Sequence, residues 1–331
     1  MIEAKPLVSI ALCSYNGAKY LRNQIDSIVS QTYRPLELII VDDKSSDNTA
    51  EILSLYAENN KDILFRVFEN ERRLGYVKNF EKAISLCSGD FIAIADQDDV
   101  WTTDKIEILM NKLGSHILIY HDSLLIDEQG QSLNKKMSDR FRMYRGRNPK
   151  QLLLYNCISG HSCLFRKELK YKFGSFNPMH YYDHWIAYVA SNLGTIGFVD
   201  QCLVSYRQHQ ESVITQMSRP GLFFSRKRRA YGKIIEHRNK IKHDISWLKR
   251  CKSLEFNKNS WFVKWLYFCM VMRQYSIISV LVFFTLLINQ KTIYYSRKPE
   301  HEYMKLTHFQ FIKKWYFWGL LGIKLRYFWR T

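Results

Sequence analysis

Short apolar segments alternate with longer amphipathic segments over the first 130 residues of the chain. The apolar segments are rich in Ile, Val, Leu and Phe, which predicts strands, and the segments between them carry apolar residues at helical spacing. Strict alternation of strand and helix predicts right-handed βαβ units and a mostly parallel sheet, that is, an α/β fold. The predicted strands are 7–14, 36–41, 63–68, 91–95 and 117–126, and the predicted helices are 20–31, 47–59, 76–87 and 103–113.

Polar residues follow three of these strands directly. The segments are S-Y-N-G (14–17), D-D (42–43) and D-Q-D-D (96–99). Because ligands of such sheets bind beyond the carboxyl ends of the strands, we expect these segments to meet in one crevice. Asp and Asn are also common in turns and at helix N-caps, which is the alternative for each position taken alone. Three carboxylates within four residues repel one another unless a cation joins them, and their oxygen ligands suit Mg²⁺ or Mn²⁺.

The sequence contains neither of the common glycine-rich phosphate motifs, G-x-x-x-x-G-K-[ST] and G-x-G-x-x-G. A nucleotide bound here therefore needs its phosphates neutralised in another way. Carboxylates that hold a cation, which in turn holds a diphosphate, meet this need. The acid pair after the second strand can accept hydrogen bonds from a base or ribose. Together these features predict a nucleotide-activated donor whose diphosphate is the leaving group.

Several motifs in a fixed order give the chain a family resemblance. The motifs are V-S-I-A-L-C-S-Y-N-G-x-x-Y-L (8–21), Q-T-Y (31–33), I-I-V-D-D-K-S-S-D-N-T (39–49), N-x-x-x-L-G-x-x-x-N-F (70–80), G-D-F-I-A-I-A-D-Q-D-D-V-W (89–101), Y-D-H-W (182–185) and Y-R-Q-H (206–209). With these motifs the chain resembles family 2 glycosyltransferases of the GT-A (Rossmann-like) fold over about residues 7–213, and the D-Q-D-D-V-W form is most similar to bacterial rhamnosyltransferase-like members.

The resemblance implies a donor site at the strand ends. Asp42 is expected to contact the uracil or thymine of the donor, and Asp96 to lie near its ribose as the first acid of the family's D-x-D motif. Arg207 is expected to pair with a phosphate, with an ordinary surface position as the alternative. The full set implied at the donor is Ser14, Tyr15, Asn16, Asp42, Asp43, Lys78, Asn79, Asp96 and Arg207.

The resemblance also implies a metal site and a catalytic base. Asp98 is expected to bind a divalent cofactor, Mn²⁺ or Mg²⁺, and His209 to complete that site unless it is an ordinary surface residue. Asp183 aligns with the family's base; the alternative is that it only caps a predicted helix over 184–193. An inverting transfer needs such a carboxylate, because the acceptor hydroxyl must lose its proton as it attacks.

A further group of residues is expected to line the sugar and acceptor pocket. Asp99 is equally suited to the metal and to the sugar. Trp101 and Trp185 are predicted as sugar platforms, with hydrophobic core as the alternative for both. His161 departs from the small or polar residue that the family often has there. The complete set is Asp99, Trp101, His161, His184 and Trp185.

The charge of the chain is divided unevenly. The 331 residues carry a formal net charge of +18, which at first suggests a nucleic-acid partner. Residues 1–218 carry 25 Lys and Arg against 26 Asp and Glu, whereas residues 219–331 carry 24 against 5. We therefore predict a GT-A catalytic domain over 1–218 and a basic, aromatic-rich helical region over 219–331. The seven cysteines have no regular spacing, which favours a reducing compartment.

The basic region contains two strongly apolar runs, 261–272 and 275–288. A nucleic-acid interface would be more polar than this, so no nucleic-acid partner is predicted. The region is either the core of a helical domain with a basic surface or a segment that lies on an anionic membrane surface. We favour the membrane: peripheral or monotopic attachment to the cytoplasmic face of the cell membrane, with a single spanning helix over 274–290 as a variant of it.

The sequence thus predicts a metal-assisted, inverting glycosyltransferase. It would move a sugar, with rhamnose favoured, from a dTDP- or UDP-sugar to a hydroxyl of a cell-surface polysaccharide or lipid-linked oligosaccharide. The alternative is a catalytically silent, membrane-attached module that binds a glycan or another partner.

Overall fold

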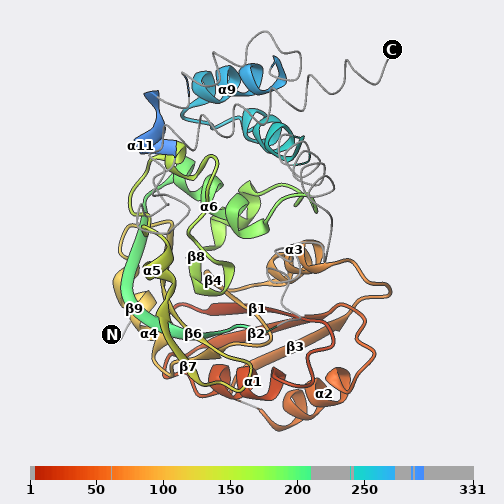
Figure 1. The fold of residues 1–331 in the computed structure, drawn as a ribbon. Coiled ribbons are helices and arrows are strands. Elements are labelled where there is room, and N and C mark those ends of the chain that lie inside the picture. Colours follow the sequence, from red (N-terminus) through yellow and green to blue (C-terminus); the bar gives the residue numbers. More distant parts are fainter. Residues whose placement is uncertain are drawn as a thin grey trace, which may run out of the picture. The chain divides into compact units, whose positions relative to one another are not determined.

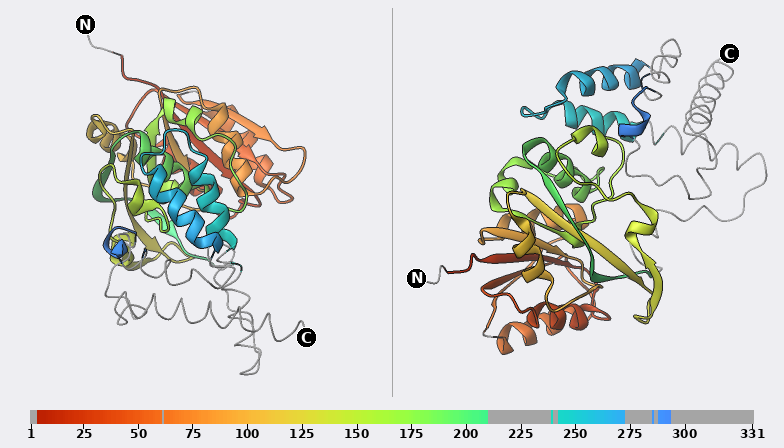
Figure 2. Two further views of the ribbon diagram at one scale, coloured as in Figure 1. Left: turned by 90° about the horizontal axis from the view of Figure 1, so that it is seen from above. Right: turned by 90° about the vertical axis from the view of Figure 1, so that its left-hand side faces the viewer.

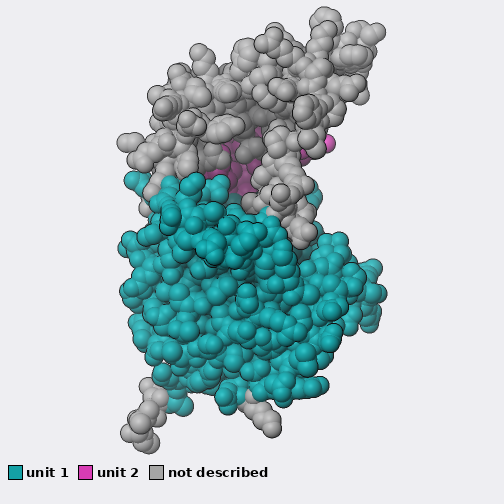
Figure 3. All heavy atoms as spheres, turned by 60° about the horizontal axis from the view of Figure 1, so that its bottom comes forward, with its two compact units in different colours: residues 1–147, 156–210 teal, residues 148–155, 211–331 magenta. Residues whose placement is uncertain are grey.

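The computed structural model describes residues 4–60, 62–209, 239, 242–272, 285 and 288–293. The chain divides into two compact units, one made of residues 1–147 and 156–210 and the other of residues 148–155 and 211–331 (Figure 3). The domain boundary predicted at residue 218 lies outside the described residues.

The first unit begins with alternating strands and helices (Figure 1). Its first four long strands pair in parallel in the order β3-β2-β1-β4. The apolar periodicity predicts these elements because each strand is covered by helices and each helix buries one face. They are β1 (Val8–Ser14), α1 (Leu21–Val29), β2 (Leu36–Asp42), α2 (Thr49–Asn59), β3 (Leu64–Glu69), α3 (Tyr76–Leu86) and β4 (Phe91–Ala95).

Helices lie on both faces of this half of the sheet. Ile25 of α1 and Ile52 of α2 belong to one hydrophobic core together with Leu12 of β1 and Ile40 of β2. Helix α3 packs against β1 and β2 from the other face, and Figure 1 shows it across the sheet from α1 and α2. Since side chains alternate along a strand, β1 and β2 supply apolar residues to both layers, and all residues of both strands are buried.

The second half of the sheet is mixed, which corrects the expectation of a mostly parallel sheet. From β4 the order continues β8-β6-β9-β5, with β7 paired to β6. Strand β9 is parallel to β6, but β8 is antiparallel to both β4 and β6. The βαβ pattern does not govern this half, because β7 returns from β6 through a short turn and β8 follows a long irregular connection. The strands are β5 (Val100–Trp101), β6 (Leu118–Ile126), β7 (Ser132–Lys136), β8 (Cys163–Arg166) and β9 (Ile196–Arg207).

Short helical elements connect these strands. Helix α4 (Lys105–Leu113) leads into β6, and α5 (Met137–Arg140) follows β7. A 3-10 turn, η2 (Gly160–Ser162), precedes β8, and a second 3-10 segment, η3 (Lys167–Lys172), follows it. Helix α6 (Tyr182–Leu193), which contains the helix predicted over 184–193, leads into β9.

The described part of the second unit is helical. It contains η1 (Pro149–Leu152), a helix over 242–252, α9 (Ser260–Met272) and α11 (Gln290–Ile293). The Trp247 indole N–H donates to the carbonyl of Leu153, and Trp247 and Leu266 are buried in the core of this unit. None of the described helices has the length and apolar character that crossing a membrane requires. Most of the run 275–288, and with it the spanning helix considered over 274–290, lies outside the described residues.

Candidate active site

The sheet register brings the polar strand ends together. Ser14 at the end of β1 lies opposite Asp42 at the end of β2. On the other side of β1, Leu12 lies opposite Ala95, the last residue of β4, and Asp96 follows it directly. The polar segments that were predicted to meet therefore lie together where β1, β2 and β4 end, and we call this region the crevice.

Asp42 joins two loops of this crevice. Its carboxylate is 2% exposed and accepts hydrogen bonds from the Ser14 hydroxyl (2.7 Å) and from the backbone N–H of Ser45 (2.7 Å). The Ser45 hydroxyl donates a third bond of 2.6 Å. Three protein donors thus fix the carboxylate at the floor of the crevice. Its expected contact with a uracil or thymine stays a prediction.

Asp43 and Asn79 hold the loop that begins α3. The Asp43 carboxylate accepts from the backbone N–H groups of Leu74 (2.7 Å) and Gly75 (2.8 Å). The Asn79 amide donates to the carbonyl of Val41 at 2.8 Å. Both side chains are only 2% exposed and pair with protein groups, so they hold this loop in place. Their expected contact with the donor stays a prediction. Lys78 lies 2.5 Å from a Glu81 carboxylate oxygen and 2.7 Å from the Ser175 hydroxyl.

Gln97, the middle residue of D-Q-D, connects the loop after β1 to the loop after β4 through two hydrogen bonds to Tyr15, and we call this connection the lock. Its side-chain oxygen accepts from the backbone N–H of Tyr15 (2.8 Å), and its amide donates to the carbonyl of Tyr15 (3.1 Å). A Cβ on Gly17 would come within 2.3 Å of that side-chain oxygen, so the glycine leaves room for the lock. Asn16 lies in the same loop with a φ of 47°, and its side-chain oxygen accepts from the Ser46 N–H.

The acidic residues after β4 form two groups with histidines. A carboxylate oxygen of Asp98 is 2.7 Å from Nε2 of His209. The second group contains Asp96, Asp99 and His161, where Nδ1 of His161 lies 3.5 Å from Asp96 and 3.8 Å from Asp99. In this group one ligand atom from each residue lies within 4.8 Å of the others, close enough to hold a metal ion.

The two groups differ in burial. The side chains of Asp98 and His209 are 16% and 10% exposed, and that of Asp96 is 31% exposed. Asp99 and His161 are 0% and 2% exposed, and Oδ2 of Asp99 has no hydrogen-bond partner in the part of the chain that the structure describes. Burial, followed by the charges of Asp98 and Asp96, raises the pKa of Asp99 well above its ordinary value. The more accessible carboxylates are therefore Asp96 and Asp98.

His161 and Lys105 form a buried layer beneath this cluster. Nε2 of His161 is 2.9 Å from the Ser123 hydroxyl, and the ring stacks on Tyr206 with centroids 4.3 Å apart. The Lys105 ammonium donates to the carbonyl of His161 at 2.7 Å. Burial lowers the pKa of Lys105 well below its ordinary value, although the charge of Asp99 opposes this. His161 thus contacts the acidic cluster from below.

Asp183 lies in the first turn of α6, beside η2. Its carboxylate accepts from the backbone N–H of the half-buried His184 (2.6 Å) and from that of Gly160. Burial raises its pKa to about 7, and the charge of Asp96 adds to the shift. A Cβ on Gly160 would lie 2.2 Å from the Tyr182 hydroxyl, so this position of η2 requires glycine. Asp183 binds N–H groups at the helix start, as the capping alternative expects, and is also a carboxyl that can exchange a proton near neutral pH.

The comparison with known families now identifies the domain. Residues 9–173 match the model of glycosyl transferase family 2. The chain belongs to this family. An uncharacterised glycosyltransferase of Rickettsia felis is 32% identical over 218 residues, a match that covers 62% of this chain and 35% of that protein. One of Methanocaldococcus jannaschii is 27% identical over 230 residues, covering 66% of this chain and 77% of that protein.

Solved structures support the same fold. TarS of S. aureus in complex with UDP-GlcNAc has a TM-score of 0.60 at 12% identity, covering 96% of this chain and 89% of that one. The mannosyltransferase PcManGT from Pyrobaculum calidifontis, in complex with GDP-Man and Mn²⁺, has a TM-score of 0.51 at 15% identity, covering 97% of this chain and 88% of that one. At these identities the likeness shows the GT-A-type α/β fold alone.

Arg207 pairs with protein groups in this family 2 domain. Its backbone N–H donates to Asp99 (3.1 Å), and its guanidinium donates to the carbonyls of Asp98 (2.8 Å) and Glu128 (3.0 Å). The side chain is 4% exposed. It therefore connects the acidic loop to the turn after β6. Its expected pairing with a phosphate stays a prediction.

Both tryptophans predicted as sugar platforms are buried. Trp101 is 3% exposed and belongs to the main hydrophobic core, with the Lys105 ammonium 3.4 Å from its ring centroid. Trp185 is 4% exposed, and its indole N–H donates to the carbonyl of Phe173 at 2.7 Å. Their burial agrees with the core alternative, and the role of sugar platform stays a prediction.

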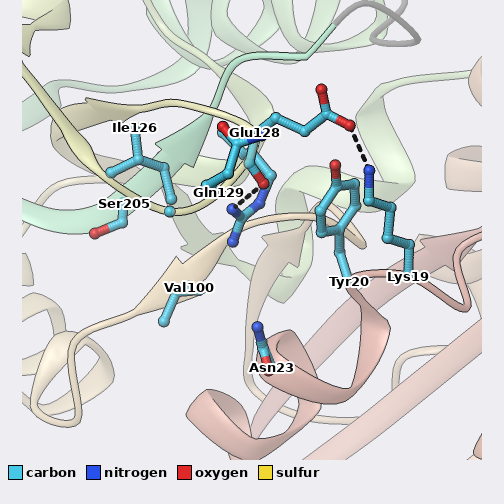
Figure 4. Close-up of a pocket in the computed structure, with 10 residues that line it drawn as sticks. Lys19, Tyr20, Asn23, Val100, Ile126, Glu128, Gln129 and Ser205 are labelled. Atoms are coloured by element: carbon cyan, nitrogen blue, oxygen red, sulfur yellow. Dashed lines mark hydrogen bonds and ion pairs between the residues drawn. The ribbon is translucent and has the colours of Figure 1, made fainter.

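A pocket of about 370 Å³ lies in the first unit beside the Asp98–His209 pair (Figure 4). Lys19 and Glu128 form an ion pair at its edge, and Arg207 and Tyr20 are among its lining residues. The Tyr20 ring is 5.4 Å from that of His209, so the pocket adjoins the pair through this aromatic contact. Asp183 does not line this pocket.

Gln97 and Lys105 were not identified from the sequence. Gln97 occupies the variable position of D-x-D, where no residue type is expected. The one feature of the sequence that relates to its role is Gly17, which lies next to the Gln97 side chain in the fold. Lys105 begins an amphipathic helix, where a lysine normally predicts a solvated position, yet it is 0% exposed. Neither role follows from periodicity, because both depend on contacts between distant segments.

Proposed function

We propose that the family 2 domain transfers a glycosyl group from a nucleoside diphosphate sugar to a hydroxyl, with inversion and with Asp183 as general base. The observation that carries this proposal is the half-buried Asp183 carboxyl, which is held at the start of α6 by backbone N–H groups and whose pKa desolvation raises to about 7, with the charge of Asp96 adding to the shift. A base for a hydroxyl works best when its pKa lies near the operating pH. An ordinary surface aspartate would be a much weaker base.

The reaction would be a single displacement. The acceptor hydroxyl oxygen forms a bond to the anomeric carbon, and its proton passes to Asp183. The bond between that carbon and the diphosphate oxygen breaks, and its electron pair leaves with the diphosphate. The transition state has oxocarbenium character, and attack from the face opposite the leaving group inverts the anomeric centre.

The residues of the crevice fit a divalent metal. Carboxylate oxygens and an imidazole suit Mn²⁺ or Mg²⁺, and the Asp98–His209 pair with Asp96 offers these donors at the more exposed side of the cluster. When bound, the metal would neutralise the negative charge that develops on the departing diphosphate. Asp99 and His161 are more deeply buried, so we assign them to the support of Asp96 and Asp98.

The donor and acceptor are proposed in narrower terms from the sequence resemblance. We propose a dTDP- or UDP-sugar, with rhamnose favoured, and a hydroxyl of a cell-surface polysaccharide or lipid-linked oligosaccharide. The fixed Ser14–Asp42–Ser45 cluster supports a base-binding floor, because buried and oriented polar groups discriminate between hydrogen-bonding ligands. The match spans only 35% of the Rickettsia felis relative, and so the activity of the whole protein is part of the proposal.

The first experiment measures donor binding. UDP-, dTDP- and GDP-sugars are each added with Mn²⁺, and the melting temperature of the chain is recorded, because a ligand of the native state raises it by mass action. A binding donor is then offered with acceptor glycans, and product formation is measured in the wild type and in Asp183→Asn.

We expect Asp183→Asn to bind the donor normally and to lose about 10²–10⁴-fold in turnover. Asp200→Asn is the matched control, because it removes an exposed carboxylate of β9. An unchanged rate in Asp183→Asn would reject Asp183 as the base. A wild-type chain that binds glycans and transfers no sugar from any donor would favour the silent binding module instead.

A further inference from the structure

Helix α9 of the second unit is apolar on opposite sides. One side packs into the core of that unit through Phe262, Val263, Leu266, Cys269 and Met270, all of which are buried. On the other side, Trp261 is 76% exposed and Phe268 is 46% exposed. A helix at the surface of a soluble domain normally carries polar residues on its outer face. We therefore expect a binding partner to cover the outer face of α9.

The exposed aromatics form one continuous stripe. Trp261, Trp265 and Phe268 are spaced at i, i+4 and i+7, which places them on one face of the helix. The rings of Trp261 and Trp265 are nearly parallel, with an interplanar angle of 4° and centroids 6.4 Å apart, and the rings of Trp265 and Phe268 are 6.1 Å apart. We call these three residues the α9 stripe. The rings pack against one another, and the Trp265 indole donates a 3.1 Å hydrogen bond to Thr285. These contacts hold the three side chains in place on the outer face of α9.

Cationic side chains accompany the stripe. Lys264 is exposed and lies on the same helix, and the Lys252 ammonium lies 4.5 Å from the ring centroid of Tyr267. Figure 2 shows α9 beside the helix over 242–252, to which Lys252 belongs. Residues 219–331 as a whole carry 24 Lys and Arg against 5 Asp and Glu. The exposed aromatic surface thus lies in a strongly cationic segment.

We propose that the α9 stripe lies in the headgroup region of an anionic lipid bilayer. Tryptophan prefers this region because its ring is apolar and its N–H remains hydrogen-bonded, and lysines beside it attract anionic headgroups. The charge complementarity selects this occupant, because a segment of sequence with so large a cationic excess attracts anionic lipid and repels a second copy of the same basic segment. The proposal does not depend on sugar transfer.

The experiment uses the full chain and sedimentation with vesicles. One set of vesicles contains phosphatidylcholine alone, and the other contains phosphatidylcholine mixed with phosphatidylglycerol. The test variant is Trp261→Ser/Phe268→Ser, which changes two exposed residues and leaves the buried side of α9 intact. The matched control is Tyr171→Ser in the first unit, where Tyr171 is 69% exposed. Circular dichroism checks that each variant is folded.

We expect the wild type and the Tyr171→Ser control to sediment with the anionic vesicles and to be released by salt, because surface charge attraction is screened. The Trp261→Ser/Phe268→Ser variant should partition at least about tenfold more weakly, since it removes the two most exposed rings of the stripe. Lys264→Gln should weaken the anionic partition by about fivefold and leave binding to neutral vesicles unchanged.

Three results would overturn the proposal. The wild type could fail to sediment with either kind of vesicle. The double variant could sediment with anionic vesicles as strongly as the Tyr171→Ser control. Finally, the substitutions could convert a dimer into a monomer in sedimentation equilibrium while vesicle binding stays unchanged, which would assign the stripe to a protein interface. Loss of vesicle binding with normal sugar transfer would support the proposal and leave the proposed function intact.

Discussion

The acidic crevice of the first unit and the α9 stripe of the second depart from the usual distribution of residues in opposite directions. In the crevice, charged groups such as Asp42 and Asp99 are 2% and 0% exposed, whereas in α9 a tryptophan is 76% exposed. Folding normally places such groups the other way round. Departures of this kind cost stability and are typical of binding sites, which agrees with our proposals of a diphosphate sugar at the crevice and a lipid surface at the stripe. The comparison predicts that changes in one region leave the function of the other intact.

The largest effect is expected in the crevice. Asp98→Asn should lower sugar transfer by about 10³-fold or more, because it removes a carboxylate that we assign to the metal beside the diphosphate. Vesicle binding should not change. Mn²⁺-dependent transfer and vesicle sedimentation are measured on the same preparation, with Asp200→Asn as the control. Full activity in Asp98→Asn would place the metal on another group of residues, and the Asp96–Asp99–His161 group would be the next to test.

The second effect concerns the lock between Tyr15 and Gln97. Gly17→Ala should displace the Gln97 side chain, whose oxygen would lie 2.3 Å from the new Cβ. Displacing the donor loop by a fraction of an ångström should lower kcat/KM by about 10–100-fold. Gly17→Ala combined with Gln97→Ala removes the clash. If the lock acts as described, the two substitutions together should cost less than the sum of the single effects.

Additive costs in that cycle would show that Gly17 and Gln97 act independently. Ala18→Gly, one position further along the same loop, is the matched control, because it changes backbone freedom without changing the contact with Gln97. Donor affinity and turnover are measured separately, so that a misplaced donor is distinguished from a misfolded protein.

The third effect is on pH dependence. Because burial raises the pKa of Asp183 to about 7, kcat/KM should rise about tenfold per pH unit below this value and level off above it. The same shift destabilises the fold as the pH rises. Asp183 is protonated in the folded protein and ionised in the unfolded chain between about pH 4 and pH 7, so stability falls across this window and then stays constant.

The free energy of unfolding of Asp183→Asn should therefore be about 1–4 kcal/mol higher than that of the wild type at pH 8. At pH 4 this gain in stability should be absent. Urea denaturation at the two pH values measures the difference. Equal stabilities of variant and wild type at pH 8 would show that the carboxyl is not held at a raised pKa.

The smallest effect is expected at the edge of the pocket. The Lys19–Glu128 ion pair is exposed, with side chains 61% and 41% accessible. Exposed ion pairs contribute little because water and salt screen them. Lys19→Gln should therefore leave the melting temperature and vesicle binding unchanged. A clear drop in melting temperature would mean that this pair holds the turn after β6 against α1.

The first half of the fold was predictable, because β1 to β4 follow one another with a helix between each pair and each element buries a regular face. The crevice was predictable for the same reason, since Ser14, Asp42 and Asp96 all end parallel strands. The second half was not, because β8 pairs antiparallel with β4 after a long irregular connection. The burial of Arg207 was also missed, since it depends on β9 pairing with β5 at the edge of the sheet. For Trp101 the sequence left the core open as an alternative.

The reversal of direction between β4 and β8 divides the residues of the proposed site between two parts of the chain. Ser14, Asp42, Ser45, Tyr15, Gly17 and Gln97 come from the chain before that reversal, and the proposed base Asp183 and the proposed metal ligand His209 come from the chain after it. A genetic exchange between two relatives within the surface segment 127–131 would therefore inherit nucleotide recognition from one parent and the proton-accepting side from the other. The crossover point would lie in the surface turn between β6 and β7 and would interrupt no helix. This turn is therefore a suitable position for joining parts of two related enzymes into a hybrid.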